Sequence, residues 1–133
     1  MIRAEELMLG DWVMSIHPAV PRPIKVTEVG GKDIGYKNGI LHISFIEPIP
    51  ITKEILEKNG FVIKKKWAQM GNFGDSPLIM WHFEDEPILR DFEHELEIHQ
   101  NDTGKVHIRI LCEYVHELQN ALKMCGITKE IEL

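Results

Sequence analysis

The stretch from residue 92 to residue 125 constrains the fold most, because its hydrophobic period changes from two to 3.6 along the chain. Its first part, FEHELEIHQNDTGKVHIRILC, alternates apolar and polar residues on both sides of the turn sequence NDTG. This alternation predicts two antiparallel strands joined by a short turn. Its second part predicts a helix from about Glu113 to Met124. The apolar stripe of that helix consists of Leu111, Tyr114, Val115, Leu118, Ala121, Leu122 and Cys125. A helix that follows antiparallel strands indicates an α+β fold.

The side chains of the predicted hairpin also specify how its strands pair. We expect Asn101 to lie opposite Lys105, because the turn can then close with a glycine bulge. This register pairs Leu96 with Ile110, Glu97 with Arg109, Ile98 with Ile108 and His99 with His107. Apolar residues then meet on one face and opposite charges meet on the other, which supports the register.

The N-terminal part of the sequence predicts short strands. The segments DWVMSI (11–16) and IKVTEV (24–29) alternate in polarity, and Asn38-Gly39 favours a type I′ turn between two further strands. That turn pairs Lys37 with Ile40, Tyr36 with Leu41 and Ile34 with Ile43. Four short strands with glycine-rich turns indicate a small, partly open SH3-like β-barrel over residues 1–50.

The middle of the sequence predicts a short helix and two more strands. Thr52 can cap the helix and Gly60 can end it. FVIKKKWAQ (61–69) and PLIMWHFE (77–84) are typical of strands. We therefore expect a second, α+β subdomain over residues 51–133, with this helix, an antiparallel sheet and the C-terminal helix.

Composition limits the classes of function. The chain has 133 residues and a formal net charge of -6, so phosphate backbones repel it unless a local basic patch exists. The N-terminus carries two early acids and no apolar run, and no segment reaches the roughly 20 apolar residues of a membrane span. Cys112 and Cys125 fall at apolar positions, so we expect both to be buried free thiols, as in a protein of the reducing cytoplasm.

His116 and Glu117 resemble the start of the zinc-protease motif H-E-x-x-H. The second histidine of that motif falls where this chain has Asn120, which is a poor zinc ligand. His116 lies on the polar side of the predicted helix, so we expect it to face solvent or to form a weak hydrogen bond. The candidate surface for contact with another protein comprises His116, Glu117, Gln119 and Asn120.

Three histidines on predicted strands are candidate metal ligands. His99 and His107 are neighbours in the predicted register, and His82 lies on another predicted strand. Glu97 could add a ligand. Seven histidines scattered over strands can also produce one adjacent pair by chance. We therefore rank a metal-dependent hydrolase third among three hypotheses for the function.

The segment KKKW is the candidate nucleic-acid contact. Lys64, Lys65 and Lys66 can neutralise phosphates, and Trp67 can stack on a base. The same residues also fit a strand whose exposed lysines discourage unwanted strand pairing. A nucleic-acid-binding module is therefore the second hypothesis.

The sequence shows no catalytic constellation. Glu93, Glu95 and Glu97 share one face of a predicted strand, but their charged neighbours indicate solvated carboxylates rather than one held in an apolar pocket. The serines have no G-x-S-x-G context, and the sequence has neither a P-loop nor a G-x-G-x-x-G motif. We therefore expect neither an enzyme nor a cofactor.

Three stretches together resemble a group of small proteins of gut bacteria and their phages and mobile elements. ELMLGDWV (6–13), PIPITKEILEKNGF (48–61) and YVHELQNAL (114–122) are similar to that group's E-L-R-I-G-N-W-V, P-I-P-L-T-E-E-I-L-L-K-N-G-F and Y-V-H-E-L-Q-N-L. The chain departs from the pattern at Met8, where the group has arginine, and at Asp11, where it has asparagine. The group has no established activity, so the resemblance transfers no catalytic residue. It implies an accessory protein of a phage or mobile element with a docking helix.

These observations predict a non-enzymatic binding or accessory protein that acts through contacts with another protein. The prediction rests on the missing catalytic motifs, on the acidic charge and on a barrel type often used for recognition, which is an analogy at the level of the fold. We expect no membrane partner. A homo-oligomer stays open, because an unpaired strand edge could pair with a second copy.

Overall fold

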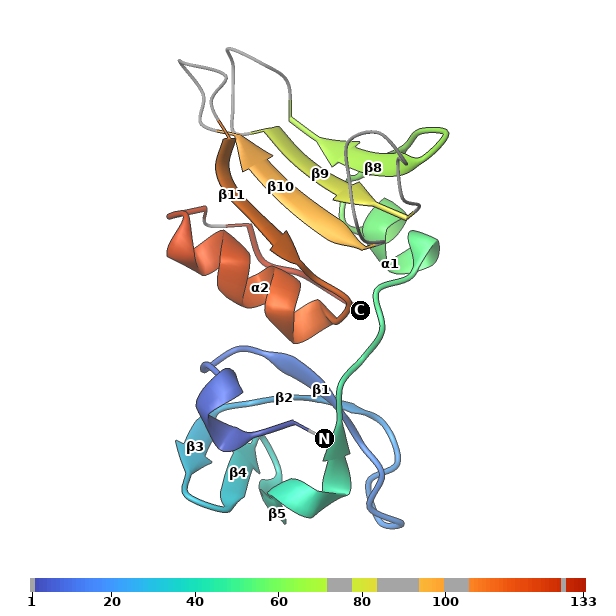
Figure 1. Cartoon of the computed structure of the whole chain (residues 1–133). Helices are drawn as coiled ribbons and strands as arrows, with labels where there is room; N and C mark the ends of the chain where they lie inside the picture. The colour runs from blue at the N-terminus through green and yellow to red at the C-terminus, as the bar shows by residue number, and fades with distance from the viewer. Residues whose placement is uncertain (1, 72–77, 84–93, 100–105, 128) are drawn as a thin grey trace. The chain divides into compact units, whose positions relative to one another are not determined.

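Two α-helices and three sheets make up the described part of the computed structural model, which confirms the α+β class (Figure 1). The structure describes residues 2–71, 78–83, 94–99, 106–127 and 129–133, and only the backbone of residues 106–108. Contacts divide the chain into two units. The N-terminal unit comprises Met1–Pro50 and Tyr114–Asn120, and the C-terminal unit comprises Ile51–Glu113 and Ala121–Leu133. The C-terminal helix is thus divided between both units, whereas the sequence placed all of it in the second.

The N-terminal unit contains two three-stranded antiparallel sheets. The first has the order β2-β1-β6, with β1 at Trp12–Ser15, β2 at Pro23–Lys25 and β6 at Ile46–Glu47. The second has the order β3-β4-β5, with β3 at Glu28–Gly30, β4 at Asp33–Tyr36 and β5 at Gly39–His42. Two 3-10 helices span Ala4–Glu6 and Ile43–Phe45. The described residues of this unit therefore form more strands than the four predicted, and they form no closed barrel.

Both sheets of the N-terminal unit contribute to one apolar core. Val13 and Ile24 lie opposite each other and point into it, because alternation turns their strand neighbours Trp12 and Lys25 to the other face. The core consists of Ile2, Leu7, Val13, Ile24, Val26, Ile34, Leu41 and Ile46. Burying one such aliphatic side chain stabilises a protein by about 1.5–3 kcal/mol, so this cluster is the main stabilising feature of the unit.

The hairpin of β4 and β5 turns one residue earlier than predicted. Lys37 and Asn38 form the turn, and Ile34 pairs with Leu41 rather than with Ile43. The partner of Ile34 moves by two positions, which keeps every side chain on its predicted face. The observed pairing buries Ile34 and Leu41 together, whereas Ile43 is the first residue of a 3-10 helix and only half-buried.

The C-terminal unit is built on a five-stranded antiparallel sheet with the order β11-β10-β9-β8-β7. Its strands are β7 at Val62–Ile63, β8 at Trp67–Met70, β9 at Leu78–His82, β10 at Glu95–His99 and β11 at Val106–Leu111. Helix α1 spans Lys53–Lys58, and α2 spans Val115–Met124. One face of the sheet is apolar and buried, with Trp81 opposite Leu96 and Ile79 opposite Ile98. The other face therefore carries the alternate residues of β10, which are polar.

The single strand predicted over residues 61–69 is wrong, because the chain reverses direction within it. β7 and β8 are separate strands that pair antiparallel. The Lys64 N–H donates a hydrogen bond of 2.7 Å to the Trp67 carbonyl and closes a tight turn over the lysines. A run of lysines contains none of the Gly, Pro, Asn or Asp residues that usually mark a turn, so the reversal has no compositional signal.

The predicted register of β10 and β11 is confirmed except at its end. Leu96 pairs with Ile110, Glu97 with Arg109 and Ile98 with Ile108. A β-bulge follows Ile98, so His99 lies opposite Val106 instead of His107. The predicted pair of Asn101 and Lys105 lies outside the described residues.

Helix α1 has the caps that its sequence predicts. The Thr52 hydroxyl accepts a hydrogen bond of 3.2 Å from the Ile55 N–H. Gly60 adopts a φ of 89°, which a side chain would disfavour, and the Phe61 N–H then donates to the Leu56 carbonyl. This geometry explains why the helix stops where the sequence reads Asn-Gly-Phe.

Helix α2 begins at Val115 rather than at Glu113. The Glu117 carboxylate accepts a hydrogen bond of 3.1 Å from the Tyr114 N–H, as the acidic residue of a capping box does. Gly126 ends the helix with a φ of 72°. The predicted apolar stripe is confirmed at Val115, Leu118, Ala121 and Leu122, which are buried, and Tyr114 is half-buried. The prediction is wrong at Leu111, which lies in β11 and is 49% exposed.

Asn59 ties α1 to the C-terminal residues of the chain. Its side chain is buried, and its amide donates hydrogen bonds of 2.7 Å to the carbonyls of Ile55 and Glu132. Its oxygen accepts a further bond of 2.7 Å from the Glu132 N–H. The neighbouring Lys58 ammonium donates to the Leu133 carbonyl.

Replacing Asn59 with leucine should lower the free energy of unfolding by about 2–3 kcal/mol, because three hydrogen bonds are lost and a backbone donor loses its partner. Urea unfolding followed by circular dichroism measures the change. Glu57→Leu, at an exposed position of the same helix, should change stability by no more than about 0.5 kcal/mol. Equal losses in the two variants would contradict the role of Asn59.

Candidate functional site

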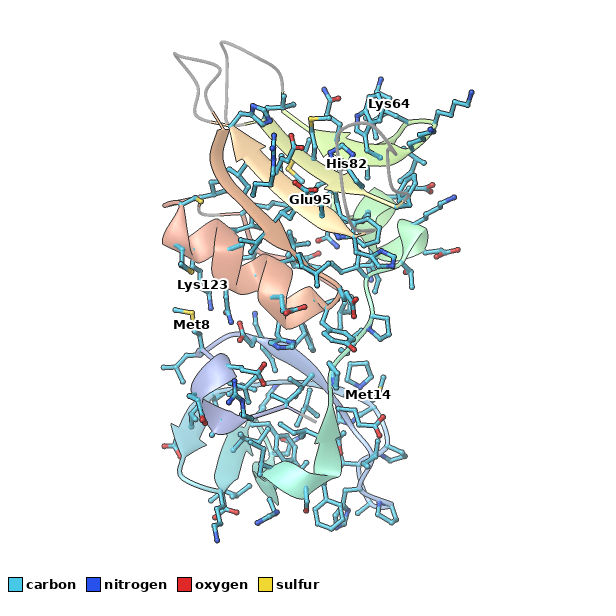
Figure 2. The ribbon with its side chains drawn as sticks, in the orientation of Figure 1. Met8, Met14, Lys64, His82, Glu95 and Lys123 are labelled. Atoms are coloured by element: carbon cyan, nitrogen blue, oxygen red, sulfur yellow. The ribbon has the colours of Figure 1, made fainter. Side chains whose placement is uncertain are left out.

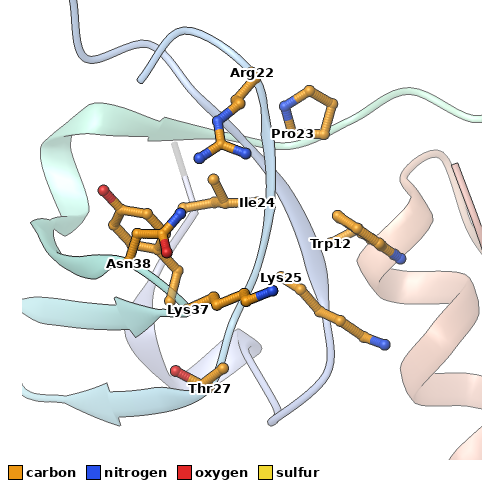
Figure 3. Close-up of a pocket in the computed structure, with 9 residues that line it drawn as sticks. Trp12, Arg22, Pro23, Ile24, Lys25, Thr27, Lys37 and Asn38 are labelled. Carbon is orange, nitrogen blue, oxygen red and sulfur yellow. The ribbon is translucent and has the colours of Figure 1, made fainter. Parts of the chain in front are cut away.

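A pocket of about 480 Å³ opens on the N-terminal unit (Figure 3). The residues that line it are Trp12, Arg22, Pro23, Ile24, Lys25, Thr27, Tyr36, Lys37 and Asn38. Two aromatic rings and a proline provide apolar surface, and three cationic side chains accompany them. Pockets of about 300–1,000 Å³ with apolar walls and a few polar groups are typical of ligand-binding sites.

Two segments of regular structure position these side chains. The register of β1 and β2 sets Trp12 directly opposite Lys25, on the face of the sheet that points away from the core. Pro23 follows on the same face of β2, since side chains alternate along a strand. The tip of the hairpin of β4 and β5 supplies residues 36–38. The pocket therefore joins the outer face of one sheet to a turn of the other.

The charged side chains at the pocket are positive, although the net charge of the chain is negative. Arg22, Lys25 and Lys37 are exposed, and none of them forms a salt bridge with a carboxylate of the described residues. The Lys25 ammonium lies 5.8 Å from the centre of the Trp12 ring, within the range of a cation–π contact. The formal net charge of the chain is -6, so three uncompensated cations here create a local positive field. The arrangement can hold an anionic group beside a flat apolar group.

Sequence reasoning missed this pocket. Its residues come from three separate parts of the chain, namely Trp12, residues 22–27 and residues 36–38. The available signal was the alternation of β1 and β2, which turns Trp12 and Lys25 outward together. That signal does not show which turn of the second sheet approaches them, because this depends on how the two sheets pack.

Ionisable side chains gather on the polar face of the C-terminal sheet, where Figure 2 labels His82 and Glu95. The Glu97 carboxylate lies 3.1 Å from Nε2 of His99 and 3.6 Å from Nε2 of His82. Nε of Arg109 lies 3.0 Å from the Glu95 carboxylate and 3.6 Å from that of Glu97. Glu95 and Glu97 are only 2% and 4% exposed, so the prediction that they are solvated is wrong.

Neighbouring cations and imidazoles explain how these carboxylates can be buried. An isolated buried carboxylate is costly, whereas one that is paired and hydrogen-bonded is tolerated. The pairing of Glu97 with Arg109 was readable from the strand register, but the burial was not, because it depends on what covers the sheet. Glu93, the third carboxylate of the predicted set, lies outside the described residues.

The predicted metal ligands are only partly brought together. His82 and His99 both contact Glu97, but the bulge removes the predicted pairing of His99 with His107. The side chain of His107 lies outside the described part of the structure. Within that described part, no group of three or more His, Cys, Asp or Glu side chains is arranged to hold a metal ion.

The lysines of KKKW occupy a turn rather than a strand. Lys64 and Lys65 are exposed, whereas Lys66 and Trp67 are half-buried. The Trp67 indole N–H donates a hydrogen bond of 3.2 Å to the Gln69 side chain, and its ring centre lies 6.1 Å from that of His82. The Trp67 ring therefore contacts residues of its own sheet.

Part of the polar side of α2 is buried, and the prediction of a solvent-facing histidine is wrong. His116 is 2% exposed and Gln119 is 7% exposed. Gln119 and Asn120 hydrogen-bond to the backbone of residues 6–12, within the N-terminal unit. Glu117 caps its own helix. Three of the four residues of the predicted contact surface thus form hydrogen bonds within the same chain.

Both cysteines are free thiols, as predicted, but Cys125 is half-buried rather than buried. Cys112 is buried, and the Cys112 carbonyl accepts a hydrogen bond of 2.7 Å from the Trp81 indole N–H. Burial raises the pKa of the Cys125 thiol. Cys125 is therefore held in the protonated form, which is a poor nucleophile.

No helix in the described residues is long and apolar enough to cross a membrane. No protein-family model, no curated protein and no solved structure matches the chain.

Proposed function

We propose that this chain is a non-enzymatic binding protein that recognises an acidic, aromatic-containing segment of another protein through the pocket of its N-terminal unit. One observation carries the proposal. Arg22, Lys25 and Lys37 surround an apolar pocket walled by Trp12 and Tyr36, in a chain whose net charge is negative. Carboxylates of a ligand would pair with the cations, and an aromatic or proline side chain would fill the apolar space.

A protein segment fits this site better than a nucleic acid does. A pocket of about 480 Å³ accommodates one or two side chains but offers no extended track for a phosphate backbone. The rest of an acidic chain repels such a backbone. Thr27 and Asn38 also line the pocket, and their side chains can hydrogen-bond to a peptide backbone. Lys64 and Lys65 lie in the C-terminal unit and contribute nothing to this site.

We also propose that the N-terminal unit is a partly open, SH3-like barrel. Two three-stranded sheets share one core, and the 3-10 helix Ile43–Phe45 directly precedes the last strand, β6. Domains of that kind bind extended peptides in aromatic-lined grooves. The resemblance to proteins of gut bacteria, phages and mobile elements adds a setting, namely an accessory protein acting in the cytoplasm on a host or phage protein.

Charge reversal at the pocket should weaken peptide binding. The probe is a short fluorescein-labelled peptide in which glutamates and prolines surround one phenylalanine, and fluorescence anisotropy reports its Kd. Lys25→Glu and Lys37→Glu should each raise the Kd about tenfold, because an attractive charge becomes a repulsive one. Raising the ionic strength should weaken binding to the unmodified chain.

Lys32→Glu is the matched control, since Lys32 is an exposed lysine of the same unit that does not line the pocket. It should leave the Kd within about twofold. A peptide with lysines in place of glutamates should not bind. Equal losses in Lys25→Glu and Lys32→Glu would contradict the proposal. Preferential binding of an oligothymidylate with a steep salt dependence would favour the nucleic-acid hypothesis instead.

A further inference from the structure

The side chain of Gln119 makes two hydrogen bonds to the segment that carries Trp12. Its Oε1 accepts a bond of 2.8 Å from the Trp12 N–H, and its Nε2 donates a bond of 3.0 Å to the Gly10 carbonyl. The glutamine is 7% exposed, so water does not compete strongly for these bonds. One amide thus satisfies two backbone groups on either side of Asp11.

These two backbone groups lie where β1 lacks a neighbouring strand. In the described residues β6 pairs with β1 only at Met14 and Ser15. On the other side, β2 pairs with Trp12, Val13 and Met14, and the Asp11 carbonyl accepts a bond from the Val26 N–H. A carboxamide presents one acceptor and two donors in a plane, like the peptide group of an adjacent strand. Gln119 therefore makes, at this edge of β1, the hydrogen bonds that a neighbouring strand would make.

We infer that Gln119 is a positioning residue for the binding pocket: it holds the Trp12 backbone so that the indole ring stays in the pocket wall. The inference rests on the function proposed above. Trp12 is half-buried, and the Gln119 oxygen accepts its backbone N–H at the edge where β6 pairs only with Met14 and Ser15. Asn120 anchors the same helix separately, since its Nδ2 donates 2.8 Å to the Glu6 carbonyl.

The chemistry of glutamine explains why this residue suits the position. Glutamate would keep the acceptor for the Trp12 N–H but would set a carboxylate against the Gly10 carbonyl. Methionine has nearly the same length and neither hydrogen-bonding group, so Gln119→Met removes both bonds at small steric cost. The two substitutions therefore separate the bond to Trp12 from the bond to Gly10.

Hydrogen exchange of single amides in the ¹⁵N-labelled full chain tests the inference without any ligand. Gln119→Met should speed exchange of the Trp12 amide about tenfold or more, because the Gln119 oxygen no longer accepts its N–H. Exchange at Val13, whose partner is Ile24 of β2, should change little. Gln119→Glu should keep most of the Trp12 protection. Asn120→Leu is the matched control, since it loosens the same helix but leaves the bond to Trp12 in place.

The same variants are then titrated with the acidic peptide. Gln119→Met should raise the Kd about threefold to tenfold, and Asn120→Leu should leave it within about twofold. Unchanged exchange at Trp12 in Gln119→Met would overturn the inference. So would faster exchange with an unchanged Kd, because Gln119 would then only stabilise the strand. If the unmodified chain does not bind the peptide, the proposed function fails, whereas the exchange data still decide whether Gln119 restrains Trp12.

Discussion

Replacing Leu118 with aspartate should leave the chain unfolded or insoluble at room temperature. Leu118 is fully buried on the apolar stripe of α2. Removing a buried leucine costs about 2–5 kcal/mol, and an uncompensated buried carboxylate adds several kcal/mol. Together these losses approach the whole stability of an ordinary domain, which is about 5–15 kcal/mol. Circular dichroism should show no cooperative melting transition.

The matched control for this variant is Met124→Asp. Met124 lies in the last turn of the same helix and is 73% exposed. An added acid there loses little apolar burial, so the expected change is no more than about 0.5 kcal/mol. A soluble Leu118→Asp protein with an unchanged Tm would contradict the packing of α2.

The second large effect is expected at the buried carboxylate of the sheet. Glu97→Lys should lower the free energy of unfolding by about 4 kcal/mol or more, because it sets a second cation beside Arg109 in a buried position. Nε of Arg109 lies 3.6 Å from the Glu97 carboxylate, and two histidines also contact that carboxylate. Urea unfolding of the purified variant measures the loss.

Two further variants show whether charge is the cause. Glu97→Gln keeps the shape and a hydrogen-bonding group, so it should cost about 1–3 kcal/mol, less than the lysine variant. Glu130→Lys makes the same charge change at an exposed position of the same unit and should be nearly neutral. If Glu97→Lys melts with the unmodified protein, the cluster contributes nothing to stability.

Local signals in the sequence predicted the elements that depend on local chemistry. The caps at Thr52 and Gly60 were readable because helix ends require particular residue types. The register of β10 and β11 was readable because the turn sequence NDTG determines which residues lie opposite each other, and this sets Glu97 opposite Arg109. The bulge before His99 was not predictable, since a bulge adds one unpaired residue to a strand without changing the hydrophobic pattern on either side of it.

Features that depend on packing were not predictable. The buried polar side of α2 and the buried Glu95 were both assigned to solvent, because polar residues usually lie there. Gln119 can be buried because it hydrogen-bonds to backbone groups far away in the sequence. Glu95 can be buried because it forms an ion pair with Arg109. The pocket was missed for the same reason. A polar residue at the edge of an apolar stripe can equally face solvent or a second element, and sequence periodicity does not separate the two.

Chemical-shift mapping of the ¹⁵N-labelled chain with the acidic, phenylalanine-containing peptide tests the central claim most directly. Binding at the pocket predicts that the Trp12 indole signal and the amides of Lys25, Lys37 and Asn38 shift with a common Kd, while those of β9 and β10 do not. Shifts confined to Lys64–Lys66 or to the C-terminal sheet, or no shift at millimolar peptide, would contradict it.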